Sequence, residues 1–364
     1  MGFKLKKSTV SKGVIIFVFL SVAVMMGILI WTTDQETWQQ FLNFKAVFIP
    51  VLLGLGVIRW LADGLAFVAL SRDKEKGSIG VGRSAVIRLQ ATLMAAIVPV
   101  ILGTFATHAY LLNKEKKDIT ESMAITVLRA ILPIFIFLLN IPILLLWDSN
   151  PLGGNFFNRL IELVSIPLVI IAVFFIITLF YPHKIKRVAS GIARWWGRVK
   201  FIHIEKILAA EERMFHEIDQ FSEIFWEYLR RKKRQLFGAI LWIFLAFLID
   251  FLIAIAIIWA FGYQPVFIKA IAVQFLMRPI IFLAPTPGGA GFWEFTYLGF
   301  FSLFMPKSLI GISVLIWRIV MTYLPALAGA FFLSREFRSE GQSGMDSIKK
   351  EIQQTMREME GEGE

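Results

Sequence analysis

The chain has 364 residues, of which 57% are hydrophobic and 14% aromatic, and its formal net charge is +11. Apolar runs of about 20 residues recur along it, which indicates transmembrane helices and excludes a single large soluble core. The absence of cysteine excludes disulfides and thiolate metal sites, the 4 histidines lack the spacing of a metal motif, and the basic charge fits a membrane protein better than a nucleic-acid-binding one.

Six apolar runs are long enough to cross a bilayer as helices. In chain order they are Val14–Trp31, Ala46–Leu70, Ile125–Trp147, Leu160–Tyr181, Leu236–Phe261 and Ser308–Ser334. Lysines precede the first run and no small-residue cleavage pattern follows it, so we interpret this run as a retained signal anchor. We therefore predict an all-α polytopic integral membrane protein with about six full transmembrane helices.

Lysine and arginine are concentrated in a few of the connecting stretches. The N-terminus, residues 72–83, residues 114–117 and residues 182–235 are basic, whereas the other loops hold few cations. The positive-inside rule places all these stretches, and both termini, on the cytoplasmic side of the cell membrane.

Two further apolar regions, residues 85–112 and 265–305, do not fit a simple crossing. Basic stretches flank residues 85–112 on both sides, and the region is too short for two crossings of about 20 residues each. We predict a re-entrant helical hairpin from the cytoplasmic side, bent between Pro99 and Gly103. For residues 265–305 we predict an opposed hairpin that enters from the outer side and is broken at Pro285–Glu294. The length of this region also permits two full crossings.

The two predicted hairpins share a pattern. Pro99–Gly103 and Pro287–Gly291 both read P-x-x-x-G, and an arginine follows each within the next apolar span, Arg129 and Arg318. Because the hairpins enter from opposite faces, the pattern indicates an inverted repeat with a site near the midplane. Chance similarity between segments rich in proline and glycine is the alternative.

These features divide the chain into four segments. They are an N-terminal membrane half (1–181) with the hairpin 85–112, a cytoplasmic basic amphipathic helical segment (182–235), a C-terminal membrane half (236–334) with the hairpin 265–305, and a cytoplasmic tail (335–364). The basic segment either packs on the inner loops or gathers anionic lipid.

Ionisable side chains inside a span cost several kcal/mol each, so each of them requires an explanation. Arg59 and Asp63 lie one helical turn apart and are interpreted as a structural pair. Arg88, near a hairpin entrance, is long enough to reach the cytoplasmic interface. Asp250 lies deep in its span and has no partner nearby in the sequence.

The remaining charges indicate an anion site. Arginine offers a planar fork of donors that suits phosphate, and a half-helix that starts near Gly291 directs its N-terminus into the membrane interior. Glu294 balances charge there, pairs with an arginine or binds an amine headgroup, and a purely structural ion pair is the alternative. The candidate substrate-binding residues are Arg278, Pro287, Gly288, Gly289, Gly291, Glu294, Arg318 and Arg129.

Several of these residues also carry a family resemblance. The stretches that carry it are Pro285–Glu294, Trp317–Arg318, Tyr323–Pro325 with Gly329, and more loosely Pro99–Gly103 followed by Leu128–Arg129. In order and spacing they resemble the flippase-like membrane family, which comprises the transmembrane region of lysylphosphatidylglycerol synthases and its stand-alone relatives. The likeness covers most of the chain.

The first half of the chain departs from the family pattern. Thr104 stands where the family often has an acid, Thr107 and His108 where it often has an arginine, and Leu128 where it commonly has a glutamate. His108 is therefore a candidate substitute for a lost cation and joins the substrate-binding set. A histidine without a role on the helix surface is the alternative.

The resemblance implies a membrane lipid translocase that moves an anionic or aminoacylated phospholipid, or a lipid-linked headgroup, along a polar path between the two hairpins. The alternatives are an intramembrane enzyme or accessory acting on a lipid-linked or polyprenyl phosphate, and a non-transporting scaffold. No GxSxG, P-loop or Rossmann motif occurs, and no aminoacyl-transfer domain is expected, so we predict no enzymatic activity. We expect no metal, cofactor or nucleic acid. Membrane lipids, a second copy of the chain and a separate lipid-modifying enzyme are the candidate partners.

Overall fold

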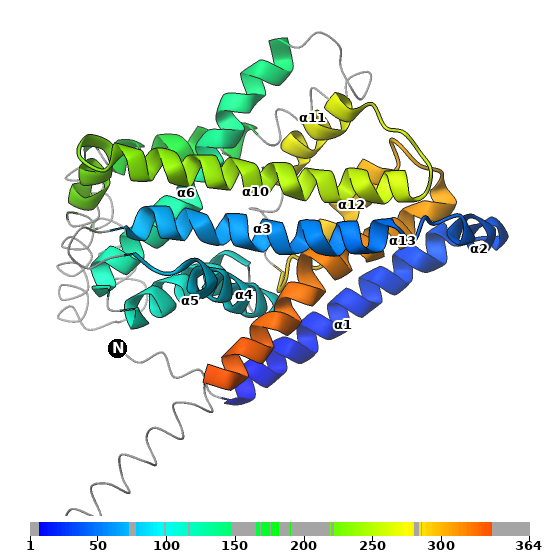
Figure 1. Cartoon of the computed structure of the whole chain (residues 1–364), viewed down its shortest axis with the longest axis horizontal. Coiled ribbons are helices and arrows are strands. Elements are labelled where there is room, and N and C mark those ends of the chain that lie inside the picture. Colours follow the sequence, from blue (N-terminus) through cyan, green and yellow to red (C-terminus); the bar gives the residue numbers. More distant parts are fainter. Residues whose placement is uncertain are drawn as a thin grey trace, which may run out of the picture.

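The computed structural model of the chain is a bundle of helices (Figure 1). It describes residues 7–72, 78–97, 100–115, 117–146, 222–279, 284 and 286–336, most of 165–181, and residues 190 and 219. The helices are α1 (Lys7–Thr32), α2 (Gln35–Leu42), α3 (Phe48–Ser71), α4 (Val81–Ile97), α5 (Val100–Lys114), α6 (Ile119–Leu146), α10 (Lys233–Ala260), α11 (Phe267–Met277), α12 (Phe292–Phe301) and α13 (Lys307–Arg318). A π-helical turn, η2 (Ile319–Tyr323), continues α13, and no strand occurs within these residues.

Five helices are long and apolar enough to cross a membrane. They are Ile15–Thr32, Phe48–Ser71, Ile119–Asn140, Lys233–Ala260 and Lys307–Glu336. They match five of the six predicted spans and confirm an all-α polytopic membrane protein. The sixth predicted span, Leu160–Tyr181, lies partly outside the described residues, and its described part between Ser165 and Thr178 is helical.

The pair α3 and α10 forms the centre of the bundle (Figure 1). At one end Lys45, just before α3, donates its backbone N–H to the carbonyl of Ala260, the last residue of α10, at 2.8 Å. At the other end the Gln235 side-chain amide donates to the carbonyl of Arg72 at 2.6 Å. The two helices are therefore antiparallel, and their ends correspond to the predicted outer and cytoplasmic faces.

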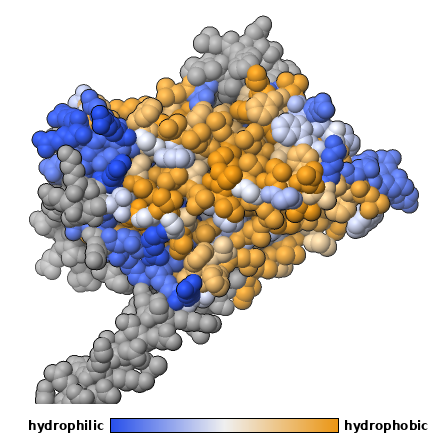
Figure 2. All heavy atoms as spheres, viewed as in Figure 1, coloured by the Kyte–Doolittle hydropathy of each residue, from blue (hydrophilic) through white to orange (hydrophobic). Residues whose placement is uncertain are grey.

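The surface carries an apolar belt. On the face drawn in Figure 2, hydrophobic side chains cover the middle and hydrophilic ones gather at the two ends. Large apolar side chains such as Ile15, Ile58 and Leu327 are more than half exposed. Such a belt is unfavourable in water and suits the hydrocarbon core of a bilayer.

The first predicted hairpin region contains α4 and α5. Arg83 near the start of α4 contacts Glu115 just after α5, with 2.5 Å between Nε and Oε1, so the two ends of this helix pair lie together. α4 ends at Ile97 and α5 begins at Val100, Pro99 lies outside the described residues, and Gly103 lies within α5. Helices of 17 and 15 residues are shorter than the roughly 20 of a full crossing. That the pair enters and leaves by one membrane face stays a prediction.

The second predicted hairpin region contains α11 and α12, of 11 and 10 residues. The helix break predicted at Pro285–Glu294 is present, because α12 begins only at Phe292 and residues 286–291 form a loop. The loop reaches the first region, since the Gly288 N–H donates to the carbonyl of Ala95 in α4 at 2.7 Å. The two interrupted segments therefore meet inside the bundle. The inverted repeat and the choice between a hairpin and two crossings stay predictions.

The four-segment division rests on the sequence. Most of the basic segment 182–235 and almost all of the tail 335–364 lie outside the described residues. Within the basic segment, residues 222–230 are helical and lead into α10. The Tyr228 hydroxyl donates to the carbonyl of Leu70, which ties this short helix to the end of α3.

Candidate functional site

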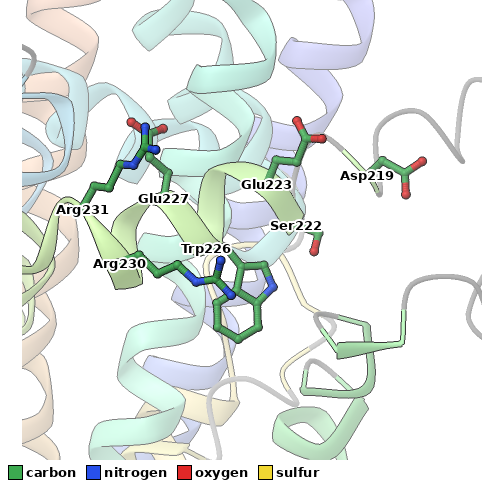
Figure 3. A pocket seen from close by; sticks show the side chains of 7 residues that line it. All are labelled: Asp219, Ser222, Glu223, Trp226, Glu227, Arg230 and Arg231. Atoms are coloured by element: carbon green, nitrogen blue, oxygen red, sulfur yellow. The ribbon is translucent and has the colours of Figure 1, made fainter.

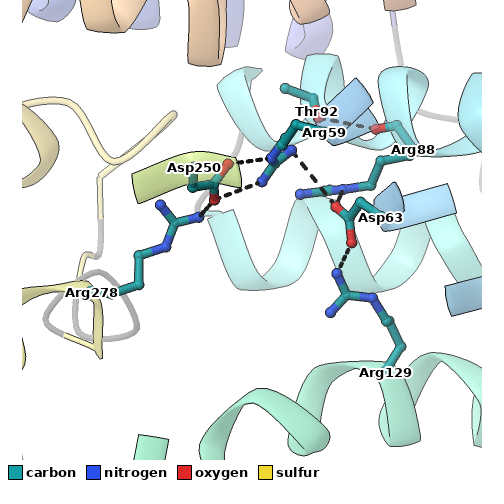
Figure 4. A network of polar contacts seen from close by, with 7 residues as sticks. All are labelled: Arg59, Asp63, Arg88, Thr92, Arg129, Asp250 and Arg278. Carbon is teal, nitrogen blue, oxygen red and sulfur yellow. Dashed lines mark hydrogen bonds and ion pairs between the residues drawn. The ribbon is translucent and has the colours of Figure 1, made fainter. Parts of the chain in front are cut away.

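Six charged side chains from five places in the chain meet inside the bundle (Figure 4). We call them the arginine cluster, and its members are Arg59 and Asp63 of α3, Arg88 of α4, Arg129 of α6, Asp250 of α10 and Arg278 at the end of α11. Buried charges are tolerated only when they are paired and hydrogen-bonded, so the pairing decides what the cluster can do.

Asp250 joins two of the arginines. Its side chain is fully buried, its Oδ1 accepts from Arg59 Nε at 2.6 Å, and its Oδ2 accepts from Arg278 Nη2 at 2.7 Å. Sequence reasoning found no partner for this aspartate, because both partners come from other helices. The close packing of α3 and α10 supplies Arg59, and the turn after α11 supplies Arg278.

Asp63 joins the other two arginines. One carboxylate oxygen contacts Arg88 Nε, and the other contacts Arg129 Nη2. The pairing of Asp63 with Arg59, expected from their spacing, is present but long, at 3.7 Å. The contact with Asp63 directs the Arg88 side chain into the bundle. The sequence had instead predicted that this side chain reaches the cytoplasmic interface.

Gly64 lets α4 come close enough for these contacts. A Cβ at this position would lie 3.0 Å from the backbone nitrogen of Ala85 and 3.0 Å from Ser84 Oγ. This is tighter than an ordinary van der Waals contact, so a larger residue would push α4 away from α3 and carry Arg88 away from Asp63. Gly64 is thus the residue in the α3 sequence that allows α4 to approach closely.

The cluster has more positive than negative charge. The four arginines bring +4 and the two aspartates bring −2, which leaves +2 among the described groups. Two of its guanidinium atoms, Arg278 Nη1 and Arg129 Nε, are buried and have no hydrogen-bond acceptor among the residues that the structure describes. In the sequence, the undescribed stretches that directly follow α4 and Arg278, 98–99 and 280–283, contain no ionisable residue.

The glycine-rich loop between α11 and α12 forms a second polar site. Gly288, Gly289 and Gly291 have positive φ angles of 62°, 62° and 88°, which residues with a Cβ rarely adopt. The Gly291 N–H donates to Glu294 Oε2 at 2.9 Å, so the first turn of α12 is capped by its own glutamate. Pro287 precedes these glycines and shapes the same loop. The predicted helix N-terminus is therefore present, and the negatively charged group bound to it is the carboxylate of Glu294.

Glu294 also pairs with Arg318, and we call these two residues the loop ion pair. Both side chains are fully buried, and Arg318 Nε and Nη2 each lie 2.8 Å from Glu294 Oε1. Arg318 Nη1 donates to Thr322 Oγ1 at 3.0 Å and to the carbonyl of Gly288 at 3.3 Å. Thr322 lies in η2, where the wider helical turn follows Arg318 directly. The loop ion pair is neutral and has the form of the structural alternative considered for Glu294.

The predicted substrate-binding residues thus fall into two groups. Arg129 and Arg278 belong to the arginine cluster, and the loop residues with Glu294 and Arg318 belong to the second site. Trp293 lies between them, because its ring is 4.6 Å from Arg278 Cζ and 5.1 Å from the ring of Trp317. Among the described residues, His108 forms no hydrogen bond or ion pair with either group: its ring lies 4.5 Å from that of Phe67, and its buried Nε2 has no partner.

Sequence reasoning did not assign Arg59, Asp63, Arg88 or Asp250 to the site. The available signal was the presence of ionisable residues in apolar segments, which had been noted for each of them. Their mutual pairing could not be derived, because Arg59 and Asp250 are 191 positions apart. Within the part of the chain that the structure describes, no group of three or more histidine, aspartate or glutamate side chains could hold a metal ion.

A surface pocket of about 690 Å³ lies on the short helix before α10 (Figure 3). Its lining mixes acidic and basic side chains, including Glu223, Glu227 and Arg230, around Trp226. The Arg230 guanidinium lies 5.0 Å from the centre of the Trp226 ring, and this ring packs edge-on to Phe180 at 5.0 Å. The pocket contains none of the predicted site residues.

Comparison with known proteins agrees with this architecture. A family model described as "Lysylphosphatidylglycerol synthase TM region" matches residues 18–329. A "UPF0104 membrane protein" from Archaeoglobus fulgidus is 23% identical over 326 residues, which cover 86% of this chain and 94% of that protein. Because the family model matches well over half of the chain, the protein belongs to the family of the lysylphosphatidylglycerol synthase transmembrane region.

Proposed function

We propose that the protein is a lipid translocase of the cytoplasmic membrane, with both termini in the cytoplasm, and that it moves lipids with anionic headgroups past the arginine cluster. The observation that carries the proposal is the cluster itself. Four arginines share two aspartates inside the membrane-spanning bundle, and buried donors remain without an acceptor. Charges at this depth are costly and mark substrate paths in membrane proteins.

The arrangement supports a physical mechanism. A phosphate headgroup that leaves water loses its hydration, and guanidinium groups replace those hydrogen bonds with donors already in place. The acyl chains stay in the bilayer throughout. The cluster is incompletely closed, since the side chains of Arg88 and Arg129 keep 18% and 14% of their surface exposed.

The contact between the two interrupted segments supports a gating step. The Gly288 N–H bond to Ala95 joins the glycine-rich loop to α4, the helix that carries Arg88. Opening this contact on one side and then the other would expose the cluster alternately to the two membrane faces. Opposed hairpins that rock around a midplane site are a known way to achieve alternating access.

The carboxylates that an intramembrane enzyme would use are engaged in ion pairs. Both oxygens of Glu294 and both oxygens of Asp250 accept from protein donors. No observation therefore favours the enzyme over the translocase, and we propose a protein without catalytic activity of its own.

The test is a translocation assay in vesicles that contain the full chain and a labelled phospholipid in one leaflet. The protein should accelerate the movement of labelled phospholipid into the other leaflet. The Arg278→Gln variant should remain folded and should lose this acceleration. Arg335→Gln, at an exposed position near the end of the last apolar helix, is the matched control and should behave like the parent chain. Equal rates with and without protein for every anionic lipid tested would contradict the proposal.

A further inference from the structure

The arginine cluster carries a net charge that its own carboxylates leave unbalanced. The described groups sum to +2, and the sequence provides no ionisable residue in the adjoining stretches 98–99 and 280–283. The loop ion pair contributes no net charge. An uncompensated charge in a low-dielectric interior is unfavourable, and the cost rises with the square of that charge. The cluster is therefore most stable with an anion of matching charge.

We propose that this anion is the phosphomonoester dianion of a lipid headgroup. The lipid source rests on the proposed function, whereas the charge argument stands apart from it. A phosphomonoester carries about −1.5 to −2 at neutral pH, because its second pKa is about 6. It can therefore neutralise the cluster with a single group.

Other lipid headgroups match the cluster less well. A phosphodiester such as that of phosphatidylglycerol brings −1 and leaves the cluster at +1. A lysyl ester of the same lipid brings two amines and one phosphate, so it adds positive charge to a site that already has an excess. The charge balance thus disfavours the aminoacylated headgroups named among the candidate substrates.

The free donors suit a phosphate group. Arg278 Nη1 and Arg129 Nε come from two different helical regions and have no acceptor among the described residues, so each can donate to a phosphate oxygen. The Arg278 guanidinium lies on the face of Trp293, 4.6 Å from the ring centre, which keeps its plane in place. Asp250 holds the same arginine through Nη2 and leaves Nη1 free. Asp250 and the Tyr297 side chain therefore hold this arginine, while its buried Nη1 has no acceptor among the described residues.

The test measures binding, not transport. The full chain is placed in nanodiscs of zwitterionic phosphatidylcholine, and short-chain phosphatidic acid, phosphatidylglycerol and cardiolipin are titrated separately at pH 7.5. Phosphatidic acid should bind on the order of tenfold tighter than phosphatidylglycerol, since it neutralises one further buried charge. At pH 5, where the monoester loses its second charge, this preference should disappear.

Charge variants test the origin of the preference. Arg278→Gln lowers the cluster to +1 and should remove the preference for the monoester, whereas Arg278→Lys retains the charge and should keep most of it. Arg335→Gln should leave it unchanged. Folding of each variant is checked by its thermal transition without added lipid. An unchanged preference in a folded Arg278→Gln variant would contradict the proposal.

The remaining arms identify the ligand. Phosphatidylglycerol binding as tightly as phosphatidic acid at pH 7.5 would overturn the inference, and so would tighter binding of cardiolipin, which carries two phosphodiesters. Equal binding of inorganic phosphate would overturn the lipid source. Selective binding of phosphatidic acid without any lipid movement would refute only the proposed translocase. Movement of phosphatidylglycerol without monoester preference would refute only this inference.

Discussion

The arginine cluster and the loop ion pair use the same chemistry with opposite results. In the loop ion pair one carboxylate meets one guanidinium, and both are fully buried. Arg318 Nη1 reaches Thr322 and a loop carbonyl, whereas Nη2 makes the ion contact with Glu294 and no hydrogen bond. In the cluster, four guanidinium groups share two carboxylates, which leaves a net charge of +2 among the described groups, whereas the loop ion pair is neutral. The comparison teaches that a buried arginine indicates a ligand only where its own protein partners fail to balance it.

The largest effect is expected at the loop ion pair. Glu294→Gln leaves Arg318 buried and uncompensated, and the loss of one partner of such a pair costs about 3 to 5 kcal/mol of unfolding free energy. The double variant Glu294→Gln with Arg318→Met removes both charges and should recover most of this loss. Thermal unfolding of the detergent-solubilised chain measures both. A double variant as unstable as the single one would show that the pair does more than neutralise itself.

A smaller effect is expected from the corresponding change in the cluster. Asp250→Asn removes the carboxylate between Arg59 and Arg278 and should cost about 3 kcal/mol, because Asp63 still lies within reach of Arg59. Phosphatidic acid in the nanodisc should restore part of this stability, since it supplies the missing negative charge. The same lipid should not restore the stability of the Glu294→Gln variant. Equal rescue of both variants would remove the distinction between the two sites.

The loop that carries the ion pair is tested by a pair of glycine substitutions. Gly288→Ala should cost about 2 to 3 kcal/mol, because its φ is positive and its new Cβ would overlap the ring of Phe17. Gly291→Ala also has a positive φ, but its Cβ would meet no atom within 4 Å, so only about 1 kcal/mol is expected. Phe17→Leu in the Gly288→Ala background should recover part of the difference in thermal stability. Equal losses for the two alanine variants would contradict the close approach of α1 to the loop.

The smallest effect is expected at a charge contact away from both sites. Glu336 near the end of the last apolar helix contacts Arg83 at 2.8 Å and accepts from Gln90 at 2.7 Å. The Arg83 and Glu336 side chains are 28% and 20% exposed, so Glu336→Gln should cost less than about 1 kcal/mol, and less still in high salt. Thermal transitions at low and high salt check both statements. A loss as large as that of Glu294→Gln would show that partly exposed pairs also determine the fold.

Much of the architecture was predictable because its signals are local. The length of an apolar run indicates a membrane span, and a stretch such as Pro287–Gly291 cannot continue a regular helix, so the break before α12 followed from composition. The expected pairing of Arg59 with Asp63 is also local, since both lie on one helix a turn apart. The likeness to the flippase-like family was carried by the second-half motif and is confirmed by the family match.

The grouping of the candidate residues was not predictable in the same way. Arg278 and Arg318 were placed in one pocket, but the first pairs with Asp250 and the second with Glu294. Residue spacing does not decide between these partners, because the choice depends on which helix faces meet. The role of Arg88 was missed for the same reason: it depends on the close approach of α4 to Gly64.

The amino-acid sequence was sufficient to predict five membrane spans, the break in the glycine-rich loop, the family and the list of charges that a bilayer must accommodate. These properties follow from hydrophobic length and from backbone restrictions at proline and glycine, which act over a few residues. Only the tertiary structure decided that Glu294 and Arg318 neutralise each other while Asp63 and Asp250 are outnumbered by their arginines. The physical reason is that charge balance depends on distances between helices, and packing alone sets those distances.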